Sequence, residues 1–326
     1  MKYIITGGQG FIGINLAKYL LSKNHKVLTI DKMSYASNAN IFKGNKKFLL
    51  KKLNICKTKE IRKLFFSFKP DVIFHLAAET HVDNSILNSE PFIKSNIIGT
   101  YSVLKSFNDY QSKSNPKALL LNISTDEVFG SISKGDFKES NKYLPNSPYS
   151  ASKASADHLV RAWNKTFKTR VITTNCSNNF GPYQNKEKLI PKIISNIIKD
   201  KPVPIYGNGL NQRDWIYVKD HAKILYQLSI KGKIGETYNI GTKNVVSNLE
   251  IINNILKIYN QKFKKKKKLK EVIKYVEDRK GHDFRYAIDN SKIEKLLKLK
   301  LKFKKNFTKN LIETFDWYFK LNSKKI

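Results

Sequence analysis

Two acidic residues stand side by side in the segment NISTDEVFG (122–130), directly after a run of apolar residues. Burying carboxylates at the exit of a core strand costs stability, so Asp126 and Glu127 are expected to do chemical work there. Burial and the repulsion of like charges favour one neutral and one ionised carboxyl group. Such a pair can donate a proton from one group and remove a proton with the other. The segment therefore predicts acid–base catalysis.

A tyrosine and a lysine four residues apart form a second catalytic candidate, in YSASK (149–153). Residues at this spacing lie on one face of a helix, so Tyr149 and Lys153 are expected to be neighbours. A phenol with a pKa of ~10 is a poor base at neutral pH. A nearby ammonium group and a positively charged nicotinamide ring lower that pKa, so the phenolate can accept a proton from a hydroxyl group. On an unrelated helix the same spacing would indicate only a surface pair.

Three glycines in TGGQGFIG (6–13) separate a β-rich run from a helical pattern. Gly7, Gly10 and Gly13 permit a tight turn and a close approach of the backbone to a pyrophosphate at the helix N-terminus. Asp31 ends the next β-rich run, where a carboxylate binds the adenosine ribose and repels a 2′-phosphate. These features predict NAD rather than NADP. Asn54 is a candidate acceptor for the adenine amino group, with a simple turn asparagine as the alternative.

Short β-rich runs alternate with helical patterns in the first half of the chain. The predicted strands are 2–6, 26–30, a part of 47–55, 71–78, 118–125 and 170–177. The predicted helices follow the glycine turn, start near a capping Thr58, and span about 91–111 and 149–167. Alternation of this kind predicts an α/β fold with a doubly wound parallel sheet, Rossmann-like and covered on both faces.

The pattern changes after residue 177. Residues 178–214 are rich in Asn, Gly, Pro and Tyr, which is typical of loops around a polar ligand. A strand and a helix follow at 214–228, and the remaining residues indicate a smaller mixed α/β domain. We expect an NAD-binding domain formed by 1–177 with 211–242, and a sugar-nucleotide-binding domain formed by 178–210 with 243–326.

The chain is strongly basic, with 61 Lys and Arg against 26 Asp and Glu, but only six of the basic residues are arginine. Nucleic-acid recognition favours the guanidinium group, and the lysines are scattered except in KFKKKKKLK (262–270). We therefore expect a solvated basic surface with an exposed loop at 262–270, and no nucleic-acid partner. The alternative is a non-catalytic basic module that binds polyanions.

The cysteine count and the hydropathy of the chain argue against a metal-binding, disulfide-rich, membrane-spanning or secreted protein. The two cysteines form neither a metal-ligand set nor a disulfide framework, so no metal is predicted. Apolar runs fall short of the ~18 residues of a membrane span, and the N-terminal one is too short for a signal peptide. A cytoplasmic protein without a membrane partner is expected.

These motifs resemble the extended short-chain dehydrogenase/reductase family, and within it the dTDP-glucose 4,6-dehydratases. The similarity extends almost end to end. It rests on TGGQGFIG, DKMSYASN (31–38), HLAAETHVDNSI (75–86), STDEVFG (124–130), PYSASKAS (148–155), NCSNNFGPYQNKEKLIP (175–191), PIYGNGLNQRDWIYVKDH (204–221) and EDRKGHDFRYAID (277–289).

The resemblance implies a hydro-lyase that converts dTDP-glucose to its 4-keto-6-deoxy product with retained NAD. Tyr149 then accepts the proton of the carbon-4 hydroxyl while hydride passes from carbon 4 to NAD. Glu127 removes the carbon-5 proton, Asp126 protonates the departing carbon-6 hydroxyl, and hydride returns to carbon 6. Thr125 binds the carbon-4 oxygen. The family also suggests a homodimer formed through helices of the nucleotide-binding domain.

The resemblance also assigns binding residues. The expected cofactor contacts are Gly7, Gly10, Phe11, Ile12, Gly13, Asp31, Lys32, Ser34, Asn54, Ile55, Leu76, Ala77, Ala78, Thr80, Ser95, Tyr149, Lys153 and Asn179. The expected substrate contacts are Thr80, Thr125, Asn178, Lys188, Leu189, Pro204, Tyr206, Arg213, Asn248, Arg279 and His282. Arg213 and Arg279 are of special interest, because guanidinium groups suit the oxygens of a diphosphate.

Three positions depart from the family pattern: Phe129, Asn84 and Lys280 stand where tyrosine, arginine and proline are usual. None of them is a proposed acid, base or hydride-transfer group, but they leave the nucleotide preference open between dTDP and UDP. A sugar-nucleotide 4-epimerase is the alternative enzyme, and the adjacent acid pair argues against it.

Overall fold

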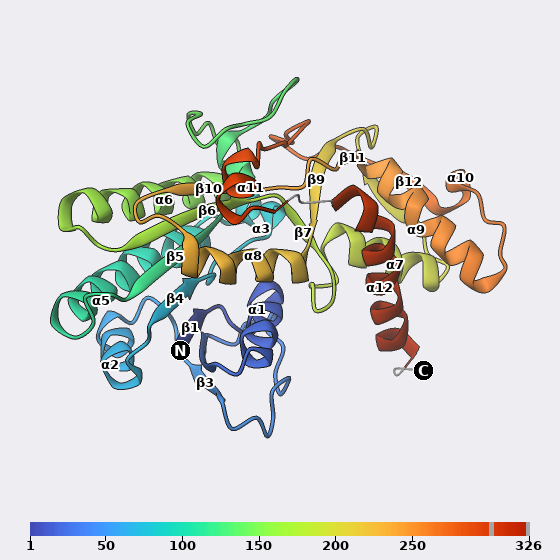
Figure 1. Cartoon of the computed structure of the whole chain (residues 1–326). Helices are drawn as coiled ribbons and strands as arrows, with labels where there is room; N and C mark the ends of the chain where they lie inside the picture. Colours follow the sequence, from blue (N-terminus) through green and yellow to red (C-terminus); the bar gives the residue numbers. More distant parts are fainter. Residues whose placement is uncertain (300–302, 324–326) are drawn as a thin grey trace.

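One sheet of seven parallel strands forms the centre of the computed structural model, which describes residues 1–299 and 303–323 (Figure 1). Its strand order is β10-β6-β5-β4-β1-β2-β3. The strands are β1 (Lys2–Thr6), β2 (Lys26–Asp31), β3 (Phe48–Lys52), β4 (Val72–His75), β5 (Leu119–Thr125), β6 (Val171–Cys176) and β10 (Thr237–Ile240). The order reverses between β1 and β4, so the carboxyl ends of these two strands flank the crevice where α/β folds bind ligands.

Helices cover both faces of this sheet, as the alternation of strands and helices predicts. Helices α1 (Phe11–Ser22) and α8 (Val218–Lys231) lie on one face, and α2 (Thr58–Phe68), α5 (Gly99–Lys113) and α6 (Pro148–Phe167) lie on the other. Within β1, Tyr3 and Ile5 pack toward α1, while Ile4 packs toward α5. Side chains alternate across a strand, so an apolar strand needs a helical layer on each side. The predicted fold class is confirmed.

Some predicted boundaries are wrong. The helix expected at 91–111 is three pieces: α4 (Glu90–Phe92), the π-helical η1 (Ile93–Ile98), and α5. Thr58 is not a cap but the first residue of α2, whose N-cap is Lys57. Strand β4 stops at His75, because the next residues turn into the ligand crevice rather than extend the ladder.

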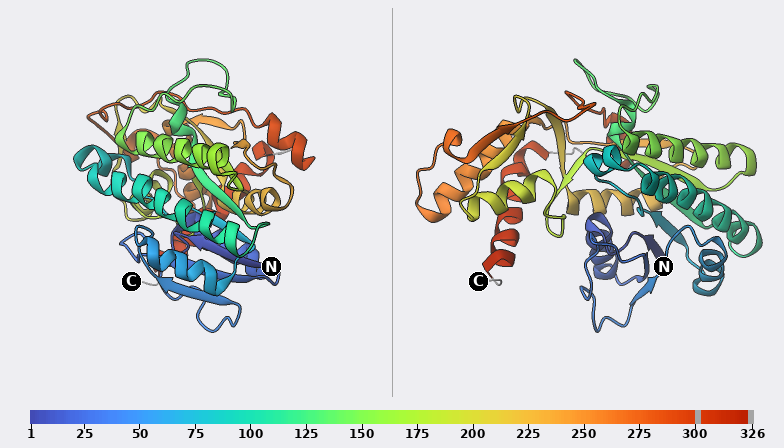
Figure 2. Two further views of the ribbon diagram at one scale, coloured as in Figure 1. Left: turned by 90° about the vertical axis from the view of Figure 1, so that its left-hand side faces the viewer. Right: turned by 180° about the vertical axis from the view of Figure 1, so that it is seen from behind.

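A second core lies beside the sheet, around β7 (Asn178–Phe180), β8 (Val203–Tyr206), β9 (Gln212–Tyr217), β11 (Val245–Ser247) and β12 (Ile273–Val276). Helices α7 (Leu189–Ile198), α9 (Asn248–Phe263) and α12 (Phe303–Ser323) pack against these strands. Two short helices, α10 (Leu269–Val272) and α11 (Ser291–Leu297), complete the fold. Strand β9 pairs with β7 and β11 in a three-stranded sheet, and not with the seven-stranded sheet. Figure 1 and the right-hand view of Figure 2 show this part standing to one side of the large sheet.

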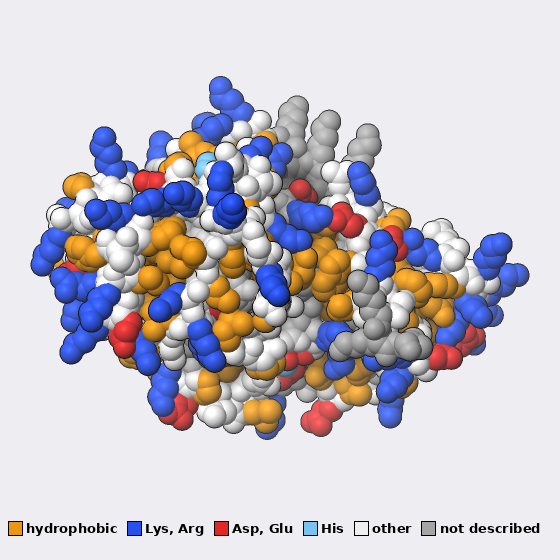
Figure 3. Space-filling view, turned by 90° about the horizontal axis from the view of Figure 1, so that it is seen from below, with side chains coloured by type: hydrophobic (Ala, Val, Ile, Leu, Met, Phe, Trp, Pro, Cys, Tyr) orange, Lys and Arg blue, Asp and Glu red, His pale blue; other side chains and the backbone are white. Residues whose placement is uncertain are grey.

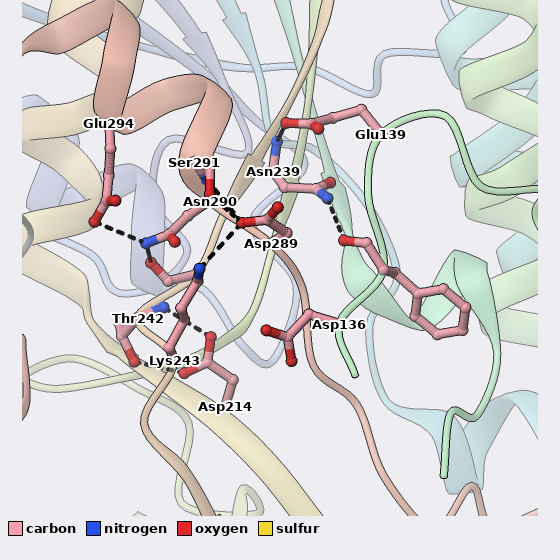
Figure 4. A network of polar contacts seen from close by, with 12 residues as sticks. Asp136, Glu139, Asp214, Asn239, Thr242, Lys243, Asp289, Asn290, Ser291 and Glu294 are labelled. Atoms are coloured by element: carbon pink, nitrogen blue, oxygen red, sulfur yellow. Dashed lines mark hydrogen bonds and ion pairs between the residues drawn. The ribbon is translucent and has the colours of Figure 1, made fainter. Parts of the chain in front are cut away.

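Polar contacts join the two parts behind the crevice (Figure 4). The Asp214 carboxylate of β9 accepts hydrogen bonds from the backbone amides of Thr242 and Asn244, at 2.7 and 3.0 Å. Lys243 between them forms an ion pair of 3.1 Å with Asp289. Both amides belong to the segment that follows β10. Their hydrogen bonds to Asp214 therefore attach the end of the large sheet to β9.

The surface is basic over a wide area. Figure 3 shows Lys and Arg side chains spread over the face seen from below, interleaved with apolar side chains. The basic segment 262–270 is mostly exposed, although α9 extends into it to Phe263 and α10 begins at Leu269. Among residues 1–299 and 303–323, no helix combines the length and hydropathy needed to cross a membrane.

Candidate active site

The acid pair sits on a short 3₁₀ helix, η2 (Asp126–Phe129), at the carboxyl end of β5. Thr125 caps this helix, because its hydroxyl accepts a hydrogen bond of 3.3 Å from the Glu127 amide. Gly130 ends it with φ +79°, and a Cβ there would lie 2.3 Å from the carbonyl oxygen of Leu144. The chain can therefore turn away directly after the acid pair, which leaves both carboxyl groups at the rim of the crevice.

The two carboxyl groups differ in their surroundings. Burial, followed by the charges of Glu127 and Asp214, raises the pKa of Asp126 well above its ordinary value. One Asp126 oxygen, Oδ2, is buried without a hydrogen-bond partner among the described residues. Burial also raises the pKa of Glu127, but Arg213, Lys188 and Arg279 oppose that effect. Burial therefore favours the neutral form of both groups, and it does so more strongly for Asp126, because three basic side chains favour the anion of Glu127.

Tyr149 and Lys153 lie in the first turns of α6, whose N-terminus is firmly capped. Ser147 and Ser150 form a reciprocal capping box there. The Lys153 ammonium donates a hydrogen bond of 2.9 Å to the carbonyl of Ile123 on β5. In the protein alone, burial and the charge of Glu127 raise the pKa of Tyr149 well above that of a free phenol. The expected lowering of this pKa therefore depends on the cation of the cofactor, since Lys153 alone does not outweigh burial.

A cavity of ≈ 300 Å³ opens at the switch point between β1 and β4, between the glycine turn and the acid pair. Every residue that the sequence predicts as a cofactor contact lines it: Gly7, Gly10, Phe11, Ile12, Gly13, Asp31, Lys32, Ser34, Asn54, Ile55, Leu76, Ala77, Ala78, Thr80, Ser95, Tyr149, Lys153 and Asn179. Thr125, Asp126 and Glu127 line it as well. One cavity therefore brings the catalytic candidates and the glycine turn together.

The residues of this cavity fit a dinucleotide. Gly7 has φ +67°, and a Cβ there would lie 2.8 Å from the backbone of Ala77, so the turn has no room for a side chain. The first turn of α1 has neither a side-chain cap nor an acidic residue, which leaves its N–H groups available to a pyrophosphate. Asp31 accepts hydrogen bonds from the amides of Gln9 and Met33 and from Ser37, so its carboxylate is held ready at the end of β2.

Asn54 lies two residues beyond β3, and its amide oxygen accepts a hydrogen bond of 2.9 Å from the amide of Cys56. The oxygen is thus used within a turn, although the residue still lines the cavity. Both of its predicted roles are compatible with this position.

A second cavity of ≈ 260 Å³ continues from the first, and Thr80, Glu127 and Lys188 line both. The predicted substrate contacts along it are Thr80, Asn178, Lys188, Leu189, Pro204, Tyr206, Arg213, Asn248, Arg279 and His282. The remaining predicted contact, Thr125, lies only on the first cavity. Glu127 therefore stands at the junction, within reach of ligands in either cavity.

The two arginines of the second cavity are held in place by the protein itself. The guanidinium group of Arg213 lies 4.2 Å from the centre of the Tyr286 ring and donates to the carbonyls of Asp283 and Phe284, at 2.8 and 3.1 Å. Arg279 forms a two-pronged ion pair with Asp83, at 2.5 and 3.2 Å, and its guanidinium lies over the ring of Tyr206. A guanidinium carries five N–H donors, so both groups keep donors for an anionic ligand.

Several residues of the two cavities were not predicted from the sequence. Asp83 orients Arg279, and Glu187 accepts a hydrogen bond of 3.1 Å from Tyr35 across the mouth of the first cavity. Lys32 also pairs with Glu79 along the same cavity. The motif HVDNSI contains Asp83, but only the tertiary structure brings it to a residue 196 positions away.

A parallel sheet with a glycine turn at β1, an acid at the end of β2 and a buried Tyr149–Lys153 pair defines an extended short-chain dehydrogenase/reductase. Asp126 and Glu127 line the same cavity as the Tyr149–Lys153 pair. The family model described as GDP-mannose 4,6 dehydratase matches residues 4–310, and the chain belongs to this family of nucleotide-sugar dehydratases.

Individual relatives agree with the family model. The dTDP-glucose 4,6-dehydratase of Salmonella typhimurium is 43% identical, in an alignment that covers 98% of this chain and 92% of that protein. A crystal structure of the dTDP-glucose 4,6-dehydratase of Streptomyces venezuelae with NAD bound matches with a TM-score of 0.89 at 34% identity, covering 98% and 97% of the two chains. The enzyme from Bacillus anthracis, in complex with NAD, gives 0.87 at 37% identity with the same coverage.

Proposed function

We propose that this chain is a lyase that converts dTDP-glucose to dTDP-4-keto-6-deoxyglucose with NAD as its cofactor. One observation carries the proposal: the Asp126–Glu127 pair lies at the junction of the two cavities, in the same cavity as Tyr149 and Lys153. The relatives that share this chain's length and sequence are named for the same activity. The product belongs to deoxysugar biosynthesis.

The residues around the glycine turn hold the cofactor in this proposal. When bound, NAD accepts a hydride from carbon 4 of the sugar and later supplies it to carbon 6. Tyr149 accepts the proton of the carbon-4 hydroxyl, and Lys153 favours the phenolate by its charge. Thr125, whose hydroxyl lies beside Asp126 at 3.3 Å, orients the carbon-4 oxygen. The ketone at carbon 4 then acidifies the proton on carbon 5.

The acid pair performs the elimination. Glu127 removes the carbon-5 proton, and the neutral Asp126 delivers its proton to the departing carbon-6 hydroxyl, which leaves as water. The environments of the two carboxyl groups support these roles, because three basic side chains favour the anion of Glu127, whereas Asp126 is buried beside two acids. Water loss leaves a double bond between carbons 5 and 6. Hydride adds at carbon 6, and the protonated Glu127 returns its proton to carbon 5. The ketone at carbon 4 stays in the product, so the proton taken up by Tyr149 leaves to solvent while Asp126 takes up a proton for the next turnover.

We propose that the second cavity binds the nucleotide diphosphate. Arg213 and Arg279 supply oriented guanidinium groups, and Lys188 adds an ammonium whose hydrogen bond to the Thr80 carbonyl is 2.8 Å long. In this division, residues 1–177 with 211–242 form the NAD-binding domain and residues 178–210 with 243–326 form the sugar-nucleotide-binding domain. Contacts cross the boundary, because Arg213 of the first domain lines the second cavity and Asn179 of the second domain lines the first. The hydrogen bond of Asp214 with Thr242 and the ion pair of Asp289 with Lys243 hold the two parts in a fixed relative position.

Incubation of the purified protein with dTDP-glucose tests the proposal. Mass spectrometry should show the loss of one water from the substrate, and UDP-glucose in a parallel reaction measures the nucleotide preference. With deuterium on carbon 4, the label should appear in the new methyl group. Simple inversion at carbon 4 without loss of water would make the protein an epimerase and contradict the proposal.

We also propose a homodimer in the cytoplasm, formed through α5 and α6. The two helices lie side by side on the outer face of the large sheet (Figure 2). Tyr101 and Phe167 are exposed there, and each of their rings packs against Trp163, at centroid distances of 5.9 and 5.5 Å. An exposed group of aromatic side chains on two parallel-running helices is typical of a subunit interface.

A further inference from the structure

Asp157 extends the face of α6 that carries the catalytic candidates. Tyr149, Lys153 and Asp157 are spaced by four residues, so all three project from the same side of the helix toward β5. All three are buried, and only Tyr149 and Lys153 line the cofactor cavity. Asp157 therefore stands one turn behind Lys153, inside the protein.

Beside Lys153, the polar neighbours of the buried Asp157 carboxylate are Asn122, Ser124, Tyr143 and His158. The Oδ1 atom of Asp157 accepts a hydrogen bond of 2.7 Å from the side-chain amide of Asn122 on β5. Its Oδ2 atom has no hydrogen-bond partner among the residues that the structure describes. Asp157 is 5% exposed, so solvent screens its charge very little. A buried carboxylate with one unpaired oxygen costs stability, which calls for a compensating role.

The Asp157 carboxylate interacts electrostatically with the ammonium group of Lys153. Burial lowers the pKa of Lys153, and Asp157 is the largest influence that raises it. The other titratable groups nearby bring no charge at neutral pH: burial lowers the pKa of His75 on β4 to about 3 and raises that of Cys176 on β6 to about 12.

The remaining neighbours of Asp157 lead to the same conclusion. Tyr143, in the loop before α6, stays neutral because burial raises its pKa, and His158 is the next residue on α6. Burial raises the pKa of Asp157 itself to about 6, with Lys153 opposing the rise. Above a pH of about 6 the charged form of Asp157 is favoured, and its charge acts on Lys153.

We propose that Asp157 is a positioning residue that keeps Lys153 charged and so supports the phenolate of Tyr149. The inference rests on the proposed function for the role of Tyr149, and it adds a third residue on α6 to the two recognised from the sequence. Asp157 touches neither cavity, so its effect passes through Lys153.

The variant Asp157→Asn tests this inference, because it removes the charge and keeps the shape and the contact with Asn122. The alkaline limb of the kcat/KM profile against pH should move down by about one pH unit, since Lys153 loses its proton earlier. Asp157→Glu should restore most of the shift. The control Asp109→Asn removes a carboxylate that pairs with Arg62 on the surface, and it should leave the profile unchanged.

A titration of Lys153 without substrate separates this inference from the proposed function. Trace labelling with an amine reagent, measured by peptide mass spectrometry over a pH series, reports the protonation of Lys153 directly. Its midpoint should fall by about one unit in Asp157→Asn, or in Asp157→Ser if the first variant does not fold. An unchanged midpoint overturns the role of Asp157. A shifted midpoint in a protein inactive on dTDP-glucose would instead overturn only the proposed function.

Discussion

At the scale of single residues, the site depends on two neighbouring carboxyl groups with different protonation. Asp126 is buried and Glu127 is half-buried at the end of β5, and only Glu127 lies where Arg213, Lys188 and Arg279 favour its anion. Asp126 has Asp214 behind it and an unpaired oxygen. Position rather than residue type thus supports the proposed roles of acid and base, since aspartate and glutamate have nearly equal pKa values in water.

Replacing the base should separate hydride transfer from elimination. In Glu127→Gln the rate of water loss should fall by roughly 10²–10⁴-fold, because general-base catalysis is lost while Tyr149 and Lys153 remain. Oxidised sugar and reduced cofactor should accumulate, as measured by the absorbance of NADH after rapid mixing. The control Glu60→Gln changes an exposed residue of α2 and should behave as wild type. Equal loss of NADH formation and water release would contradict the assignment.

Removing the carboxyl group of Asp126 should raise the stability of the fold and abolish the dehydratase activity. A carboxyl whose pKa is raised by folding makes the free energy of unfolding decrease as the pH rises from its unfolded pKa to its folded pKa. Asp126 has such a raised pKa, so Asp126→Asn should unfold at a temperature about 3 °C higher than wild type at pH 8. At pH 4 the difference should shrink. Differential scanning calorimetry at both values, together with the loss of dehydratase activity, checks this; a lower unfolding temperature at pH 8 would contradict it.

At the scale of elements, the site is built where ends of strands and helices meet. The acid pair follows β5, the proton acceptor starts α6, and the short helix α3 (Val82–Leu87) brings Asp83 to Arg279 from the far part of the chain. Helix α3 also contacts α6, because the Ser85 hydroxyl accepts a hydrogen bond of 3.2 Å from the Tyr149 amide. One short helix therefore links the proposed phosphate-binding arginine to the catalytic tyrosine.

Breaking the Asp83–Arg279 ion pair should affect substrate binding more than chemistry. In Asp83→Asn the guanidinium of Arg279 loses its two-pronged partner, so KM for dTDP-glucose should rise by roughly 5–10-fold while kcat changes little. Steady-state kinetics measures both values. Asp136→Asn, which breaks a pair with Arg285 outside both cavities, is the matched control and should leave KM unchanged. A change confined to kcat would show that α3 serves the tyrosine and not the arginine.

At the scale of the whole molecule, the excess of positive charge fits the proposed binding of an anionic nucleotide sugar. The net charge of +35 is spread over the surface, and of the six arginines, two lie in the second cavity. A basic surface of this kind raises the local concentration of an anionic nucleotide sugar. The exposed aromatic side chains of Tyr101 on α5 and Phe167 on α6 interrupt the charged surface on the outer side of these helices.

The proposed dimer can be tested without disturbing the site. The double variant Tyr101→Glu and Phe167→Glu should be monomeric at micromolar concentration by analytical ultracentrifugation, because two buried charges on each subunit would oppose association. Bound NAD should be retained, since neither residue lines a cavity. Leu144→Glu changes an equally exposed apolar residue in a loop and should leave the dimer intact. A wild-type monomer would exclude this interface.

The amino-acid sequence alone predicts those features of the fold and the site that depend on residues close together along the chain. Spacing of four residues placed Tyr149 and Lys153 on one helix face, alternation of apolar runs predicted the parallel sheet, and the glycine turn with Asp31 predicted the dinucleotide cavity. These features follow from helix and strand geometry, which acts over a few residues. The π-helical turn at Ile93–Ile98 escaped prediction because a distant contact supports it: Asn96 bonds to the carbonyl of Glu79 and to Ser152.

Contacts between distant segments set the surroundings of each carboxyl group, the ion-pair partner of Arg279, and the buried environment of Asp157 next to Lys153. Asp214, Arg213 and Arg279 approach the acid pair from segments about 90 to 150 residues away in the sequence, and their charges act through space. Asp83 and Arg279 meet across 196 residues. Electrostatic energies depend on distance and burial rather than on sequence separation. They therefore follow from the folded structure and not from the order of residues along the chain.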